Sequence, residues 1–395
     1  MPPRSRADRV ARSHDAARAA FRLGAGFLLW AVAWAVVIAA GDDPTWWGPL
    51  HVFVTGTVLL AISGATQLFS TTWSASSPPD RRLGAIQRWT LAAGAIGVVV
   101  GYSRRLDWLL VPGAILVALG LALLGGMLVG VVRRSLLRRF DWATRFYLLA
   151  LGCGLVGVTL GGVVGAGAAG ASHLDLRTAH MHLNLVGLVG FTIVGTIPTL
   201  LPTTVHHRMV SGKELKLSFL GSVVAAIAMA SGAIFGPVPV GFGAAVAALA
   251  GGTILGGVVL RLGVARVFGA GFPASMIVTG AIWLVGWAAH QAYVLIASGH
   301  RVFAAATAIG VCGVALVLFG SLAYLVPVLA GPGERLGANF ARMRRSGWVR
   351  MLLGNAVPVA VVVGLPAAVA VSIGAAFVAD FALRVIRVFW RRSAD

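Results

Sequence analysis

Histidine has the clearest capacity for chemistry in this sequence, because imidazole binds haem iron, copper and zinc. His180 and His182 stand two residues apart within a long apolar run, and His51 opens another. Two residues correspond to about 200° around a helix, so His180 and His182 point to different faces. A haem with two axial histidines needs two rings that face each other from different helices. The pattern therefore predicts a haem site between these two runs.

Two further residues belong to the candidate cofactor site. Asn184 and Gly187 follow His180 on the same helical face, at the fourth and seventh positions. Glycine has no side chain, so Gly187 is expected to leave room beside the helix for a flat macrocycle. The predicted haem-binding residues are His51, His180, His182, Asn184 and Gly187.

A metal site that uses copper or another metal is the second prediction from the histidines. Its candidate ligands are His51, His180, His182 and His290. His206 and His207 form an adjacent pair, but they follow a proline and precede an arginine, which is typical of a solvated loop.

The composition places these histidines in a membrane. Of 395 residues, 58% are hydrophobic and 11% are charged, and the mean hydropathy is +0.89. A soluble domain carries about 25% charged residues, so this chain is predicted to be a polytopic membrane protein. The formal net charge is +20, but the arginines lie in short clusters between apolar runs, so no nucleic-acid partner is expected. Cys153 and Cys312 lie inside apolar runs, so no disulfide framework is predicted.

We predict an all-α transmembrane bundle of 11–12 spans. Apolar runs long enough to cross a bilayer occur near 22–40, 50–70, 86–103, 108–132, 146–171, 178–202, 216–235, 237–260, 268–298 and 302–331. The last stretch, 351–390, is either two spans or one span and an interfacial helix. No internal repeat is evident.

The distribution of basic residues predicts the orientation. Arg and Lys concentrate in the N-terminal tail and in alternate loops, and the other loops hold only Arg104, Arg105, Arg177 and Arg301. By the positive-inside rule the N-terminus is cytoplasmic, which places His51, His180 and His182 at the outer end of their helices. The expected parts are a basic cytoplasmic tail (1–21), one transmembrane domain (22–390) and a basic C-terminal tail (391–395).

Two of these helices resemble a known family. The segment His180–Pro202 begins with His-Met-His and continues with Gly187, Gly190, Gly195 and Pro198. It resembles the late His-x-His helix of haem-copper oxidase subunit I, most closely that of the high-affinity cytochrome c oxidases and the nitric oxide reductases. Pro49-Leu50-His51 resembles the second helix of that family. The longer motif is also similar to that of the haem- and copper-containing membrane proteins of the nitric-oxide response.

The resemblance implies roles for individual histidines. By this likeness, His51 and His182 hold a low-spin haem b, and His180 faces a second, catalytic haem or its remnant. The sequence departs from the oxidases because residues 52–172, where the family's copper ligands are expected, contain no histidine. Of the carboxylates, Asp380 alone falls deep within an apolar run. We therefore expect neither oxygen reduction nor proton pumping.

The predicted function is that of a haem-binding redox protein. It binds haem b near the outer face and acts in electron transfer or in nitric oxide or small-ligand chemistry; whether it is an oxidoreductase enzyme stays open. One alternative is a multi-pass transporter that carries a metal ion or small solute on the same histidines, and another is an accessory subunit without a cofactor. The expected location is the cell membrane, with lipid and a redox partner or second subunit as neighbours.

Overall fold

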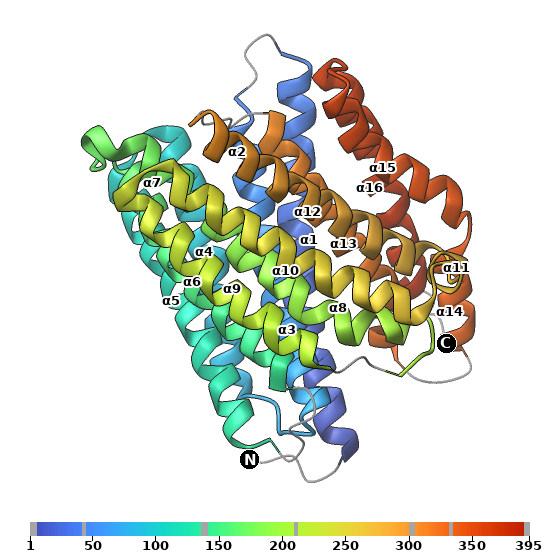
Figure 1. Cartoon of the computed structure of the whole chain (residues 1–395). Helices are drawn as coiled ribbons and strands as arrows, with labels where there is room; N and C mark the ends of the chain where they lie inside the picture. The colour runs from blue at the N-terminus through green and yellow to red at the C-terminus, as the bar shows by residue number, and fades with distance from the viewer. Residues whose placement is uncertain are drawn as a thin grey trace.

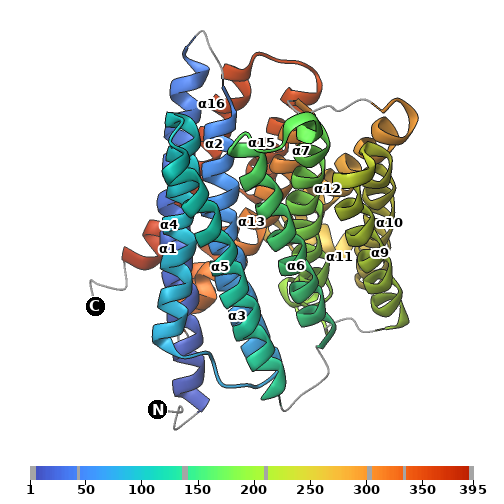
Figure 2. The ribbon, with the colours of Figure 1, turned by 90° about the vertical axis from the view of Figure 1, so that its left-hand side faces the viewer.

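The computed structural model of the chain is built from helices. It describes residues 6–41, 45–135, 141–208, 212–299, 305–331 and 335–390, and these ranges contain no strand. Eleven helical segments among the described residues are long and apolar enough to cross a membrane. Figures 1 and 2 show them gathered into one bundle. The prediction of an all-α, multi-pass membrane protein is confirmed, whereas a cytoplasmic N-terminus stays a prediction.

The elements follow one another in this order: α1 (Arg6–Ala39), α2 (Trp47–His51), η1 (Val52–Val58), α3 (Leu59–Trp73), α4 (Arg81–Arg104), α5 (Asp107–Arg133), α6 (Asp141–Gly165), η2 (Gly170–Ser172), α7 (His173–His182), η3 (Leu183–Gly190), α8 (Phe191–Thr204), α9 (Lys213–Phe235), α10 (Pro237–Leu262), α11 (Val264–Gly269), α12 (Phe272–Ala297), α13 (Ala305–Ala330), α14 (Arg335–Arg344), α15 (Gly347–Val362) and α16 (Ala367–Trp390).

One helix runs through the predicted boundary between the N-terminal tail and the transmembrane domain. Because α1 begins at Arg6, most of the predicted basic tail is helical and continuous with the first span. The predicted C-terminal tail, 391–395, lies outside the described residues. The stretch 351–390 divides at Gly364, whose positive φ of 73° ends α15. With 16 residues, α15 is about 24 Å long, shorter than a hydrocarbon core of about 30 Å, so the bundle has eleven long segments and a short extra helix.

The two segments that carry the predicted haem ligands are the innermost. The first, Trp47–Trp73, joins α2, η1 and α3, and 78% of its most apolar part is buried. The second, Gly170–Thr204, joins η2, α7, η3 and α8, and 94% of its most apolar part is buried, against 17% for α1. Both begin at the end of the bundle that lies away from the N-terminus (Figure 2). The histidines therefore sit at one end of the bundle's centre.

These two central segments repeat one another. Each carries a histidine, a glycine five residues later and a second glycine eight residues after that: His51, Gly56 and Gly64 in the first, and His182, Gly187 and Gly195 in the second. In both, the helix widens to a π-helix directly after the histidine, at η1 and at η3. Such widened turns occur often at functional sites. The two segments thus share a local pattern around their histidines.

The repeated glycines seat each central helix on the helix that precedes it. A Cβ at Gly187 would lie 2.6 Å from the Cβ of Cys153, and one at Gly195 would lie 2.6 Å from that of Phe146, both on α6. In the first copy, Gly56 and Gly64 face α1 in the same way, and a Cβ at Gly64 would lie 3.0 Å from that of Ala20. Two helix pairs, α1 with α3 and α6 with α8, are therefore built on one plan.

Candidate functional site

His51 is fixed in orientation by its own helix. Its Nδ1 lies 2.9 Å from the carbonyl oxygen of Trp47, one turn earlier, and the two rings stack with centroids 4.0 Å apart. A carbonyl oxygen only accepts hydrogen bonds, so Nδ1 is the protonated nitrogen and Nε2 keeps its lone pair. This is the tautomer that a histidine needs to bind a metal through Nε2.

His180 is held in the same tautomer by a different helix. Its Nδ1 lies 2.7 Å from the carbonyl oxygen of Gly157 on α6. A Cβ at Gly161, also on α6, would lie 2.5 Å from that nitrogen, so only glycine leaves room for the ring. Asn184 donates a hydrogen bond of 2.8 Å from Nδ2 to the carbonyl oxygen of His180. A glycine face of α6 thus forms the seat of this histidine.

The two histidines face each other across the centre of the bundle. The ring centroids of His51 and His180 are 6.5 Å apart and the ring planes differ by 3°. Both rings are half-buried, and they belong to the two central segments. The structure thus brings together one pair of the predicted ligands, with both Nδ1 atoms committed to the backbone and both Nε2 atoms available.

His182 faces a different neighbour from His180, as their spacing predicted. Its ring is fully buried and stacks on Trp287 of α12, with centroids 5.6 Å apart, and its Nδ1 lies 2.9 Å from the carbonyl oxygen of Thr178. The Nε2 of His182 is buried and has no hydrogen-bond partner among the described residues. The resemblance implied that His182 is the partner of His51, whereas the ring opposite His51 belongs to His180.

Two further expectations for the site need correction. The space beside Gly187, expected to hold a macrocycle, is taken by the side chain of Cys153. His290 is exposed on α12. The described residues contain no group of three or more His, Cys, Asp or Glu side chains that could hold a metal ion. The four predicted metal ligands therefore do not form one cluster.

The other histidines lie outside this constellation. His173 is exposed at the start of α7, and His206 and His207 are exposed just after α8, as the loop prediction requires. The loop residue His300 lies outside the described residues.

An aromatic column leads from His51 towards the surface. Trp47, stacked on His51, stacks in turn on Tyr102 with ring centroids 3.9 Å apart. Tyr102 lies near the end of α4 and is 43% exposed. Trp47 and Tyr102 therefore join an exposed position to one half of the histidine pair.

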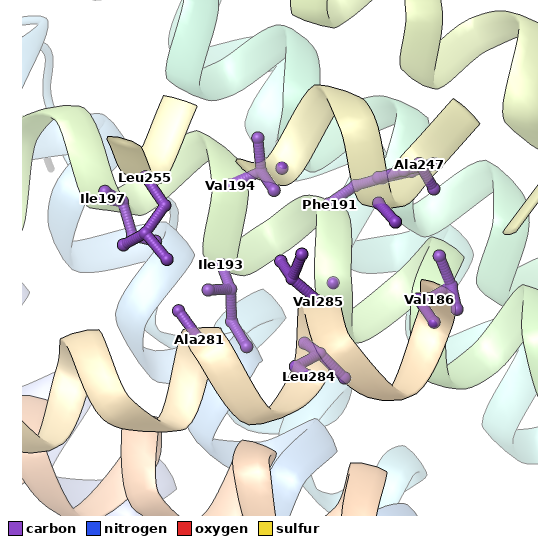
Figure 3. A pocket seen from close by; sticks show the side chains of 14 residues that line it. Val186, Phe191, Ile193, Val194, Ile197, Ala247, Leu255, Ala281, Leu284 and Val285 are labelled. Atoms are coloured by element: carbon purple, nitrogen blue, oxygen red, sulfur yellow. The ribbon is translucent and has the colours of Figure 1, made fainter. Parts of the chain in front are cut away.

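A small apolar pocket lies further along the second central segment. Figure 3 shows side chains of η3 and α8, among them Val186, Phe191 and Val194, facing Ala247 of α10 and Leu284 of α12. Its volume is about 30 Å³ and no titratable side chain lines it. A cavity needs about 10–15 Å³ to hold one water molecule, so this pocket is far too small for a porphyrin.

Several residues of the site escaped the sequence analysis. Nothing in the sequence links the glycines of α6 to the histidines, yet the carbonyl oxygen of Gly157 accepts a hydrogen bond from His180 and Gly161 makes room for its ring. Their i, i+4 spacing was visible in the sequence, but nothing there showed which helix lies against them. Trp47 and Tyr102 also needed the structure, because they stack only once α2 and α4 are placed together.

Comparison with known proteins does not assign this chain to a family. No protein-family model matches this sequence, and no curated protein matches it either. The likeness to haem-copper oxidase subunit I rests on the residues of the two central segments alone.

Proposed function

We propose that this chain is a haem-binding membrane protein of electron transfer, with His51 and His180 as the two axial ligands of one haem b. The observation that carries the proposal is the facing pair of imidazoles, 6.5 Å between centroids and nearly parallel. An imidazole nitrogen binds a metal at about 2 Å, so two rings on opposite sides of one metal have centroids about 6 Å apart. The observed separation fits such a pair.

The hydrogen bonds of the two histidines support the same proposal. Metal-binding histidines almost always donate their second N–H to a carbonyl or carboxylate, which fixes the ring and its tautomer. His51 does so to Trp47 and His180 does so to Gly157. Both rings therefore already have the tautomer that binding iron through Nε2 requires.

A bound haem would supply an iron centre that gains and loses one electron. A haem held by the imidazoles of both His51 and His180 would favour electron transfer over the binding of a diatomic gas. The stacked rings of Trp47 and Tyr102 would provide a path between His51 and a redox partner at the surface. The pairing with His180 in place of His182 follows the geometry and departs from the family resemblance.

Spectroscopy of the purified protein tests the proposal. The chain is produced in cells that make haem, and the reduced and oxidised spectra are recorded together with the haem content. We expect a red protein with the sharp low-spin spectrum of two axial histidines. Replacing either His51 or His180 with Ala should abolish that spectrum, and replacing the exposed His290 with Ala should leave it unchanged.

The variant His182→Ala decides between the two pairings. If it keeps the low-spin spectrum, His180 is the partner of His51; if it loses the spectrum while His180→Ala keeps it, our assignment is wrong and the family pairing holds. A colourless wild-type protein would refute haem binding. Binding of zinc or copper would then favour a transporter, and a protein that binds none of these would favour an accessory subunit.

A further inference from the structure

A polar cavity lies at the opposite end of the bundle from the histidines. It occupies about 260 Å³ among α1, the end of α3, the following loop and the start of α4. This end also holds the N-terminus (Figure 2). The lining side chains that matter here are Arg12, Arg81 and Arg88, with Ser13, Gln67 and Thr71. One water needs only about 10–15 Å³, so the cavity can take a polyatomic group.

The carboxylates of the cavity are already engaged. Asp80 accepts hydrogen bonds from the backbone N–H groups of Arg82 and Leu83, at 2.8 and 3.2 Å, and so caps α4. Asp15 pairs with Arg18 and lies 3.9 Å from a guanidinium nitrogen of Arg81. These contacts leave neither carboxylate to pair with Arg88.

Arg88 is the unsatisfied member of the lining. Its side chain is half-buried on α4, and no residue that the structure describes forms a hydrogen bond or ion pair with its guanidinium. Burying a charged group without a partner is costly. A half-buried guanidinium without a partner, beside an open cavity, would be stabilised by an anion from outside the chain.

Neutral hydrogen-bonding groups form another wall of the same cavity. The hydroxyl oxygens of Ser13 and Thr71 lie 3.1 Å apart. The side-chain amide nitrogen of Gln67, Nε2, donates a hydrogen bond to the carbonyl oxygen of Ser63 at 3.1 Å. Ser13, Thr71 and Gln67 are all buried. The hydroxyl of Thr71 donates within its own helix to the carbonyl oxygen of Gln67 at 2.8 Å, and that of Ser13 then donates to Thr71. The groups that can donate to an anion in this cavity are therefore its guanidinium groups.

We propose that this cavity binds a phosphate group at the membrane surface. Guanidinium groups match the geometry of phosphate oxygens and form charge-assisted hydrogen bonds to them. The lining carries three arginines and two carboxylates, and one of those carboxylates, Asp15, pairs with Arg18 outside the lining, so the cavity is positively charged. The phosphodiester of a phospholipid headgroup and free inorganic phosphate share the chemistry that this charge favours, and titration with each distinguishes them. The inference stands apart from the haem proposal, because the histidines lie at the other end of the bundle.

Lipid titration tests the site. The full-length protein, in a detergent that contains no phosphate group, is titrated with phosphatidylglycerol and separately with inorganic phosphate, and bound ligand is counted by native mass spectrometry. We expect saturable binding of one phosphatidylglycerol molecule. Arg88→Gln should weaken it about tenfold or more, because a charge-assisted hydrogen bond contributes at least that much to binding, and Arg88→Lys should restore part of it.

Arg82→Gln is the matched control, since Arg82 is exposed near the start of the same helix and its side chain does not line the cavity. It should bind lipid like the wild type. If inorganic phosphate displaces the lipid, free phosphate is the ligand. If inorganic phosphate does not displace it, the lipid headgroup is the ligand. Equal losses in Arg82→Gln and Arg88→Gln would overturn the proposal. If Arg88→Gln does not fold, the titration of the wild type tests the proposal. A wild type that binds neither phosphatidylglycerol nor inorganic phosphate saturably would overturn the proposal.

Discussion

A single methyl group added on α6 should disturb the histidine pair although neither histidine is replaced. In Gly161→Ala the new Cβ would lie 2.5 Å from Nδ1 of His180. Ordinary contacts between heavy atoms are about 3.5 Å or longer, so the ring must move by about 1 Å. That movement would break the 2.7 Å contact with the carbonyl oxygen of Gly157. Metal–ligand distances tolerate only about 0.2 Å.

The expected result is a loss of haem affinity with only a small loss of stability. Removing the group that orients a metal-binding histidine costs about 10–100-fold in affinity. Overpacking destabilises a fold by about 1–3 kcal/mol, whereas Gly→Ala within a helix stabilises it by up to about 1 kcal/mol. The net destabilisation should therefore be about 0–2 kcal/mol.

Haem titration of the apoprotein, together with thermal unfolding, measures both quantities. Gly152→Ala is the matched control on the same helix, because its new Cβ would have nothing within 4 Å. It should bind haem like the wild type. Equal haem affinity and equal low-spin spectra for the two variants would refute the seat that we assign to His180.

Three further predictions follow from the described contacts. Gly187→Ala should destabilise the fold by about 1–3 kcal/mol, and Cys153→Gly in the same chain should recover much of the lost thermal stability, because the clash lies between these two positions. The pKa of Asp80 is held below its usual value by the backbone N–H groups it caps. The ionised carboxylate stabilises the fold above the ordinary pKa of about 4, and this stabilisation is lost as the pH falls through the lower pKa of the folded state. The stabilities of the wild type and Asp80→Ala should therefore converge in acid, as measured by unfolding in detergent. Tyr102→Ala should leave the haem spectrum unchanged and slow reduction by an external donor severalfold in stopped-flow traces; an unchanged rate would remove the aromatic column as a route.

Hydropathy was sufficient to predict the helices. A bilayer demands about 20 apolar residues for each span, and the predicted runs correspond to observed helices throughout. The last stretch was ambiguous because Gly364 and Pro366, which end α15 and precede α16, lie within an otherwise apolar run. The start of α1 was also predicted poorly, because charged residues at the end of a helix do not prevent the helix from continuing into water.

The candidate site was predictable in its residue types and less so in its pairing. His51, His180 and His182 were identified because ionisable side chains are rare within apolar runs. Which two rings meet depends on how the central segments are rotated, and the π-helical turns after His51 and His182 alter that rotation. The seat on Gly157 and Gly161 depends on which helix lies alongside, which hydropathy does not encode.

The π-helical turns at η1 and η3 help to set the direction of each histidine. A π-helical turn holds more residues than the 3.6 of an α-helical turn. A one-residue deletion within η1 would return this turn to α-helical geometry. The direction of His51 relative to Gly64 therefore depends on the geometry of this turn as well as on their spacing in the sequence.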